Sequence, residues 1–268
     1  GATKSLKREG FFKTNTEGTK NLVRALIAEG MTPKRFVFVS SLSIFGAIRE
    51  KPYPYQPILD TDTPVPNTAY GESKWEAEKF LESVKQNVGL DGEHGGFPYV
   101  ILRPTGVYGP RERDYYIMAK SIRQHVDFAV GYRPQDITFV YVDDVVQAVY
   151  NALDAPDAVG KGYFLSDGRV YNSRAFSDLL QRELGNPWVL HIKAPLWFLQ
   201  LVCAVSGTVC GWMGRLTTLN LDKYHILSQR NWQCDIEPAR RDFGYDPQWP
   251  LEQGVKETVR WYKANGWL

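Results

Sequence analysis

The sequence predicts an α/β fold in which a parallel sheet is flanked by helices. Segments typical of strands and of helices alternate through the first 150 residues, and such alternation favours parallel strands joined by helical crossovers. The apolar fraction of 43% and the aromatic fraction of 13% are sufficient for a packed core. A chain of 268 residues has room for one large domain, or for one domain with a smaller addition.

The elements of the first half follow in order along the chain. A helix is predicted over residues 15–29, and a second helix begins near Tyr70. A third helix carries Asp143 and Asp144 in its first turn. Three β-rich apolar runs have the length of strands: RFVFVSS (35–41), YVILRP (99–104) and DITFVYV (136–142).

The second half is predicted to be a smaller α/β region. GYFLS (162–166) is typical of a short strand, and SRAFSDLLQRELG (173–185) of a helix with a serine cap and a terminal glycine. The last helix follows Pro250 and carries an apolar stripe: Leu251, Val255, Val259 and Tyr262. We therefore expect one domain over residues 1–154 and the second region over 155–268, with the last helix packing back on the first domain.

Composition excludes several classes of function. Lys and Arg total 32 against 30 Asp and Glu, which leaves a net charge of +2 and no indication of a nucleic-acid partner. Three cysteines without a CxxC pair fit a reducing compartment, so a cytoplasmic protein is expected. The four histidines lack any familiar zinc spacing, and no metal site is expected.

Residues 194–214, APLWFLQLVCAVSGTVCGWMG, form an uncharged stretch that approaches the length of a membrane span. The stretch contains Pro195, Gln200, Ser206 and three glycines. These residues favour a helix, a loop and a second short helix that cap a pocket. A membrane-contacting surface is the alternative, and membrane contact is not expected.

Tyr70 and Lys74 stand four residues apart at the start of a predicted helix. Residues at this spacing share one face of a helix, so the hydroxyl and the ammonium can converge. A nearby cation favours the phenolate and so lowers the pKa of the tyrosine toward a range useful for proton transfer. Chance produces this spacing often, and an ordinary surface pair is the alternative.

The strand about thirty residues upstream ends in Ser40 and Ser41. A hydroxyl at the carboxyl end of a parallel strand lies where open α/β sheets bind ligands. A strand that ends in serine, a loop, and then a helix that opens with Tyr70 and Lys74 together favour a catalytic site over a chance pair.

These motifs resemble those of the extended short-chain dehydrogenase/reductase family, which includes nucleotide-sugar epimerases and 3β-hydroxysteroid and dihydroflavonol reductase types. The resemblance implies a Rossmann-like sheet, NAD or NADP as cofactor, and a small-molecule substrate. The matching segments follow the family order through the whole chain: NTEGTKNL (15–22), FVFVSSLSIFG (36–46), YGESK (70–74), LRPTGVYGP (102–110), FVYVDDVVQAV (139–149) and the ending (239–268).

The resemblance implies a catalytic role for each matching polar residue. Tyr70 would be the general acid/base, and Lys74 would lower its pKa and bind the nicotinamide ribose. Ser41 would hold the substrate oxygen, with Ser43 as the second candidate. Asn15 would support the local proton relay and helix geometry.

The resemblance also implies cofactor and substrate contacts after the second predicted strand. Arg103, Pro104 and Thr105 would lie beside the nicotinamide, although a structural salt bridge is the alternative for Arg103. Val107 and Tyr108 would follow on the wall of the substrate pocket.

Two features depart from the family pattern. Leu42 and Ser43 follow Ser41 where family dehydratases carry an Asp-Glu pair, so sugar dehydration is not expected. The chain also lacks the opening strand, G-x-x-G-x-x-G turn and helix that hold the cofactor pyrophosphate. The glycine-rich segment at 89–96 follows no strand and is predicted to be an exposed loop.

The absence of the opening strand, glycine-rich turn and helix leads to four expectations. The sheet is a partial Rossmann-like sheet, the chain is truncated and inactive alone, and NAD cannot be distinguished from NADP. An apolar strand edge would be left open, so the chain either associates as a homo-oligomer or packs in an unusual way.

The first functional hypothesis is an NAD(P)-dependent oxidoreductase that transfers hydride on a secondary alcohol or ketone. Residues 155–268 would then mainly bind the substrate. An apolar lid in this region favours a bulky apolar alcohol, with core packing as the alternative for its residues: Trp188, Trp197, Phe198, Leu199, Leu201, Trp212 and Met213. The second hypothesis is a nucleotide-sugar epimerase, with Arg215, Lys223 and Arg230 available for a diphosphate. The third is a non-catalytic fragment or binding module.

Overall fold

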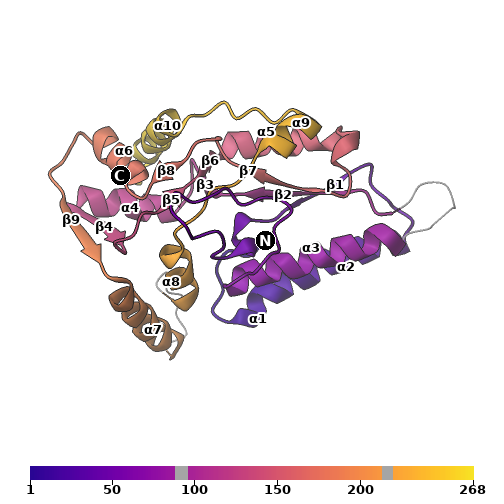
Figure 1. Cartoon of the computed structure of the whole chain (residues 1–268), viewed down its shortest axis with the longest axis horizontal. Coiled ribbons are helices and arrows are strands. Elements are labelled where there is room, and N and C mark those ends of the chain that lie inside the picture. The colour runs from indigo at the N-terminus through magenta and orange to yellow at the C-terminus, as the bar shows by residue number, and fades with distance from the viewer. Residues whose placement is uncertain (88–95, 213–219) are drawn as a thin grey trace.

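The central sheet of the computed structural model is parallel, as predicted. The structure describes residues 1–87, 96–212 and 220–268. Strands β1 (Phe36–Val39), β2 (Tyr99–Pro104) and β7 (Gly162–Leu165) form the sheet in the order β1-β2-β7 (Figure 1). In this register Val39 is opposite Leu102, and Arg103 is opposite Phe164.

Helices cover both faces of this sheet, which explains why every residue of β2 is buried. α2 (Gly18–Ala28) and α3 (Ala69–Asn87) lie on one face, and α5 (Val142–Leu153) and α9 (Glu237–Phe243) lie on the other (Figure 1). Side chains alternate along β2 accordingly. Tyr99 and Ile101 pack with the first pair of helices, whereas Val100 and Leu102 join the core that includes α5 and α9.

The first helical segment is longer than predicted and includes an irregular turn. α1 (Arg8–Phe11) continues through a π-helical turn (Phe12–Glu17) into α2. Two short 3₁₀ helices cover Leu42–Phe45 and Pro156–Ala158. The predicted loop at 89–96 lies outside the described residues except for Gly96.

The predicted strand over residues 136–142 is divided and does not join the central sheet. β5 (Asp136–Ile137) pairs antiparallel with β8 (Tyr171–Asn172), whereas β6 (Phe139–Tyr141) pairs parallel with β3 (Gly106–Tyr108). The hydroxyl of Thr138, between the two strands, donates to the Trp232 carbonyl at 2.5 Å. The third strand of the central sheet is instead β7.

An aromatic and aliphatic core lies beside β3 and β6. It includes side chains from α4 (Asp114–Arg123), α6 (Ala175–Glu183) and α10 (Leu251–Ala264). The stripe predicted on the last helix is confirmed, because all four of its residues are buried: Leu251, Val255, Val259 and Tyr262.

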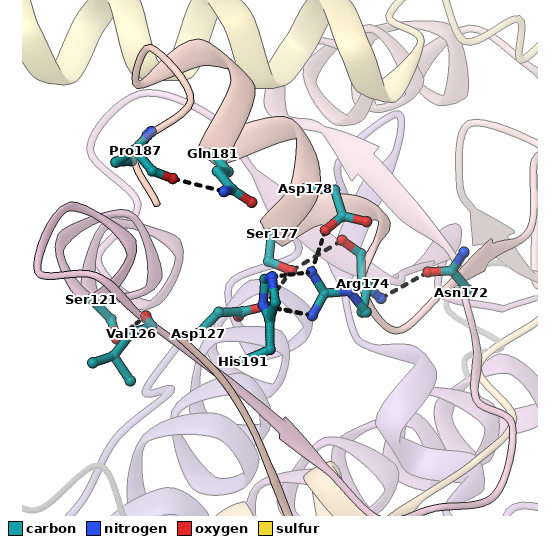
Figure 2. Close-up of polar contacts among 10 residues, drawn as sticks. All are labelled: Ser121, Val126, Asp127, Asn172, Arg174, Ser177, Asp178, Gln181, Pro187 and His191. Carbon is teal, nitrogen blue, oxygen red and sulfur yellow. Dashed lines mark hydrogen bonds and ion pairs between the residues drawn. The ribbon is translucent and has the colours of Figure 1, made fainter. Parts of the chain in front are cut away.

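β4 (Val126–Val130) and β9 (Leu190–Ala194) form a separate parallel ribbon at one end of the molecule (Figure 1). A polar cluster attaches this ribbon to α6. Figure 2 shows Asp127 of β4, His191 of β9, and Arg174 and Ser177 converging. The buried Asp127 carboxylate accepts from Arg174 Nη1 at 3.0 Å and from Ser177 Oγ at 3.3 Å.

The uncharged stretch forms one helix as far as Trp212, not the predicted helix, loop and second short helix. α7 (Leu196–Trp212) begins directly after Pro195, and Met213 and Gly214 lie outside the described residues. The next helix within the described residues is α8 (Leu221–Ser228). No helix of the described ranges is both long and apolar enough to cross a membrane.

Candidate active site

Ser41 lies two residues after the end of β1 and caps the 3₁₀ helix that follows. Its Oγ accepts a hydrogen bond from the Ser43 backbone N–H at 3.2 Å, and the Ser43 hydroxyl donates to the same Oγ at 3.0 Å. The backbone is thus helical from Leu42 to Phe45. Ser43 is buried and holds the Ser41 hydroxyl in place.

Tyr70 is the second residue of α3, and its side chain interacts with Ser41. Burial raises the pKa of Tyr70 above its ordinary value of 10.0, and the hydrogen bond with Ser41 opposes this increase. The prediction that the pKa would be lowered is therefore wrong for this structure. The physical reason is burial, which disfavours the charged phenolate, although Lys74 Nζ lies 6.0 Å from the centroid of the Tyr70 ring.

Lys74 is buried on the same side of α3, with only 7% of its surface exposed. Its Nζ donates to the Val39 carbonyl at 2.8 Å and lies 4.9 Å from the centroid of the Phe38 ring. Burial lowers the pKa of Lys74 from 10.5 to about 8, and the nearby Glu78 carboxylate opposes the decrease. The ammonium is thus fixed at the carboxyl end of β1, close to Tyr70.

Asn15 lies in the π-helical turn and connects three segments of the chain. Its Nδ2 donates to Ser73 Oγ at 3.0 Å, and its Oδ1 accepts from the Ala2 N–H at 2.7 Å. Ser73 in turn donates to the Tyr70 carbonyl at 2.7 Å. π-Helical turns are frequent at functional sites.

Ser73 was missed by the sequence reasoning. A serine three residues after Tyr70 lies one helical turn away, and that spacing could have indicated the contact with the Tyr70 carbonyl.

Arg103 forms a buried ion pair with Glu78 of α3. The distance from Arg103 Nη2 to Glu78 Oε2 is 2.7 Å, and both side chains are almost fully buried. The guanidinium also lies 5.5 Å from the centroid of the Phe45 ring. This placement agrees with the alternative that Arg103 forms a structural salt bridge, because its guanidinium is paired with Glu78.

Pro104 and Thr105 follow at the end of β2, next to β7. Pro104 is buried, and the Thr105 N–H donates to the Leu165 carbonyl at 3.0 Å. The Thr105 hydroxyl is buried and has no hydrogen-bond partner among the described residues. A hydroxyl left in this state is available to a bound molecule.

Tyr108 does not lie on an open pocket wall. It is buried in a cluster of aromatic rings, with its ring centroid 5.3 Å from that of Phe176 and 5.4 Å from that of Tyr141. The expected substrate contact therefore lacks an accessible surface in this structure. Val107 is partly buried against the main core.

The cations proposed for a diphosphate have other partners where the structure describes them. Arg230 is buried, and its three donor groups reach the carbonyls of Ser228, Val130 and Leu227. Lys223 Nζ lies 3.2 Å from Asp114 Oδ2. Arg215 lies outside the described residues.

The profile of the NAD dependent epimerase/dehydratase family matches residues 2–172. The chain is 28% identical to UDP-glucose 4-epimerase of Vibrio cholerae, over 92% of this chain and 68% of that protein. It is 27% identical to 3-beta-hydroxysteroid dehydrogenase of Mycolicibacterium neoaurum, over 95% of this chain and 68% of that protein. The chain thus spans about two thirds of the length of these relatives.

Solved structures share the fold over almost the whole chain. UDP-glucose 4-epimerase of Thermotoga maritima with UDP-glucose superposes with a TM-score of 0.72 at 24% identity, over 99% of this chain and 76% of that one. The dTDP-glucose 4,6-dehydratase of Bacillus anthracis in complex with NAD gives a TM-score of 0.72 at 17% identity, over 98% and 72%. The Rossmann-like fold and the family resemblance are both confirmed. The chain belongs to the NAD dependent epimerase/dehydratase family.

Proposed function

We propose that the full-length protein is an NAD(P)-dependent oxidoreductase that moves hydride between the nicotinamide and a secondary alcohol or ketone. The observation that carries the proposal is the convergence of Ser41, Tyr70 and Lys74 at the carboxyl end of β1. Ligands of open α/β sheets bind at this edge. Membership of an NAD dependent family supports the same chemistry.

Tyr70 is the proton donor when a carbonyl group is reduced. Its raised pKa keeps the phenol protonated at neutral pH, so it can donate to the oxygen on which negative charge develops. Ser41 donates a second hydrogen bond to that oxygen, and Ser43 keeps the Ser41 hydroxyl in position. In the oxidation direction Tyr70 accepts the proton, and the Lys74 ammonium, whose Nζ lies 6.0 Å from the centroid of the Tyr70 ring, stabilises the phenolate.

The nicotinamide, when bound, supplies or accepts the hydride. Lys74 and Thr105 fit the nicotinamide end of such a cofactor. An ammonium has three donors, of which one binds the Val39 carbonyl, and the Thr105 hydroxyl is buried without a partner among the described residues. The strand–helix junctions described here lack the glycine-rich turn that holds a pyrophosphate. The 268 residues alone are therefore expected to be inactive.

A bulky apolar alcohol is the first candidate substrate. The donor groups of Arg230 bind main-chain carbonyls, and Lys223 is paired with Asp114. Releasing either cation for a diphosphate would leave buried or half-buried partners unsatisfied. An uncharged alcohol requires no such rearrangement.

Nucleotide-sugar epimerisation is the second candidate. The observation in its favour is the similarity to the epimerase of Vibrio cholerae, which extends over 92% of this chain. Epimerisation at a secondary alcohol begins with the same hydride removal, so the roles of Ser41, Tyr70 and Lys74 are common to both candidates.

The test compares Tyr70→Phe with Tyr108→Phe in the full-length protein. The Tyr108 hydroxyl is buried without a partner among the described residues, so its loss is a matched control for removal of a tyrosine hydroxyl. Turnover of an apolar secondary alcohol and of UDP-glucose is followed with NAD and with NADP. Tyr70→Phe should reduce turnover about 10²- to 10⁴-fold, while Tyr108→Phe retains it.

Three results would count against the proposal. Full turnover by Tyr70→Phe would remove the proton-transfer role. Turnover of UDP-glucose alone would favour the epimerase. No turnover and no nucleotide binding by the wild-type protein would favour a non-catalytic binding module.

A further inference from the structure

Glu78 lies one helical turn after Lys74 on α3, and both side chains reach the sheet. Residues four apart share one side of a helix, with about 5–6 Å between their Cβ atoms. Lys74 binds the Val39 carbonyl of β1, and Glu78 binds Arg103 of β2. Val39 is opposite Leu102 in the sheet, so the two contacts are made at neighbouring positions. A buried carboxylate thus lies beside the active-site ammonium.

The ion pair of Glu78 and Arg103 is fixed by its surroundings. Glu78 Oε2 accepts from Arg103 Nη2 at 2.7 Å and from Nε at 3.2 Å. Gly162 of β7 makes room for the guanidinium, since a Cβ there would lie 2.7 Å from Arg103 Cζ. The ring centroids of Phe45 and Phe164 lie 5.5 and 5.8 Å from the same Cζ. Neither charge can turn toward water, because both side chains are buried.

Stability alone gives little reason for such a pair. The cost of removing two charges from water is similar to the attraction between them, and apolar residues of the same volume are often as stable or more so. The pair lies next to Lys74, on the helix that also carries Tyr70. A role in the chemistry of the site is therefore the stronger explanation.

The buried Lys74 is sensitive to any charge nearby. Burial lowers its pKa to about 8, and the carboxylate of Glu78 opposes this decrease. Without that carboxylate, the ammonium would lose its proton at a lower pH, closer to neutrality. A neutral amine has one donor fewer and lacks the charge that stabilises a phenolate on Tyr70.

The other groups that face Lys74 within the described residues cannot replace Glu78. The Tyr70 phenol is protonated at neutral pH, and its ring centroid lies 6.0 Å from Lys74 Nζ. β1 contributes an aromatic ring and a backbone carbonyl, neither of which ionises. A Cβ on Gly1 would lie 3.1 Å from Nζ, but the amino group of a terminal glycine is a cation. Arg103, beyond Glu78, is positive as well.

We propose that Glu78 is a further positioning residue of the active site, held by Arg103 and acting through Lys74. Its negative charge keeps the ammonium protonated at the carboxyl end of β1. Arg103 in turn limits the effect of that charge, so the three side chains form a buried row of alternating sign. This inference rests on the proposed function, because the role of Lys74 in catalysis is part of that proposal.

The test compares Glu78→Gln with Arg103→Met in the full-length protein. The titration of Lys74 is followed by NMR with an isotope label at the lysine Cε, and Lys74→Met identifies the signal by its absence. Glu78→Gln leaves the Arg103 cation unpaired, so the midpoint should fall from about 8 by about one pH unit or more. Arg103→Met leaves the Glu78 carboxylate unpaired, so the midpoint should rise by a similar amount.

Two controls separate the effect of charge from damage to the fold. Glu76→Gln removes a half-buried carboxylate that is paired with Lys79 on the same helix, and should leave the Lys74 midpoint unchanged. The double variant of Glu78→Leu with Arg103→Met has no unpaired charge, so it stays informative if a single variant fails to fold. Since Glu78 is the charge that acts on Lys74 in the intact pair, the double variant should titrate below wild type. Circular dichroism and thermal denaturation show which variants are folded.

The pH dependence of kcat/KM for alcohol oxidation is the second readout. The rate constant should fall on the alkaline side as Lys74 loses its proton. This fall should move to lower pH in Glu78→Gln and to higher pH in Arg103→Met. An ion pair with a merely structural role would destabilise both variants without moving the fall in opposite directions.

Opposite shifts of the Lys74 midpoint in the two single variants, with no shift in Glu76→Gln, would support the proposal. Equal midpoints in all variants, or shifts in one direction only, would overturn it. A raised KM for the nucleotide in Arg103→Met, with an unchanged midpoint, would also overturn it and assign Arg103 to the cofactor site. The NMR titration needs no turnover, so it decides the proposal even if Tyr70→Phe retains activity and the proposed function fails.

Discussion

Replacement of Lys74 by methionine should stabilise the fold at neutral pH and lose that advantage in alkali. The pKa of Lys74 falls from 10.5 to about 8 on folding, chiefly because burial disfavours the charged form. The difference between the two pKa values corresponds to a penalty of about 3 kcal/mol for keeping the buried side chain charged at pH 7. Methionine fills a similar volume without this penalty.

The sign of the pH dependence follows from proton binding. Between about pH 8 and pH 10.5 the unfolded chain still holds the proton that folded Lys74 has released, so wild-type stability rises with pH. At about pH 10 the remaining penalty is about 1 kcal/mol. The advantage of Lys74→Met should therefore shrink by about 2 kcal/mol between neutral pH and pH 10. The lost hydrogen bond to Val39 lowers the advantage at neutral pH by about 1–3 kcal/mol.

Urea denaturation of both proteins at the two pH values measures this change. The control is Lys79→Met, because Lys79 lies on the same helix with 46% of its side chain exposed. Its effect should be the same at both pH values. A stability difference between wild type and Lys74→Met that does not change with pH would refute the assignment of a buried ammonium.

Two further predictions concern carboxylates. Arg103→Met should lower the free energy of unfolding by about 3–5 kcal/mol, because Glu78 is left as an unpaired buried charge. The double variant Arg103→Met with Glu78→Leu should have a free energy of unfolding close to that of wild type, as measured by urea denaturation. A double variant as unstable as the single one would contradict this reasoning. Asp242→Asn should cost about 1–3 kcal/mol at neutral pH, because hydrogen bonds from Arg241 and, to a lesser extent, Lys161 hold the pKa of Asp242 well below 3.8. Because the pKa of Asp242 is depressed in the folded state, this stabilisation is lost as the pH falls. The difference in free energy of unfolding between Asp242→Asn and wild type should therefore become smaller below about pH 4. A difference that stays constant in acid denaturation would count against this reasoning.

The parts of the fold that follow from local periodicity could be predicted from the sequence. The apolar stripe of α10 repeats with the helical period, and the runs that became β1 and β2 are β-rich and apolar along their length. The spacing of Tyr70 and Lys74 likewise places them on one side of α3. These features depend on residues close together in the chain.

Features that depend on distant residues could not be predicted. Arg103 and Glu78 are 25 residues apart and meet only when α3 packs on β2. The burial that raises the pKa of Tyr70 is a tertiary property, whereas the sequence indicated only the neighbouring lysine. Tyr108 is buried because Gly254 lets α10 approach closely, since a Cβ there would lie 2.2 Å from the Tyr108 hydroxyl.

The side of α7 that packs against the protein could not be predicted either, for a related reason. Its sequence is apolar on all sides, so hydrophobic periodicity cannot indicate which side packs against the protein. The structure determines this through Leu199 and Cys203, which are buried.

The measurement that tests the catalytic account most directly is a double-mutant cycle of Ser41→Ala and Tyr70→Phe on kcat/KM in the full-length protein. The two hydroxyls interact with each other, and in the proposed mechanism both act on the same substrate oxygen, so they should behave as one unit. The double variant should then be hardly slower than Tyr70→Phe alone. Losses that multiply, so that the double variant is slower by the product of the two single effects, would show that Ser41 and Tyr70 act independently and would contradict the proposed site.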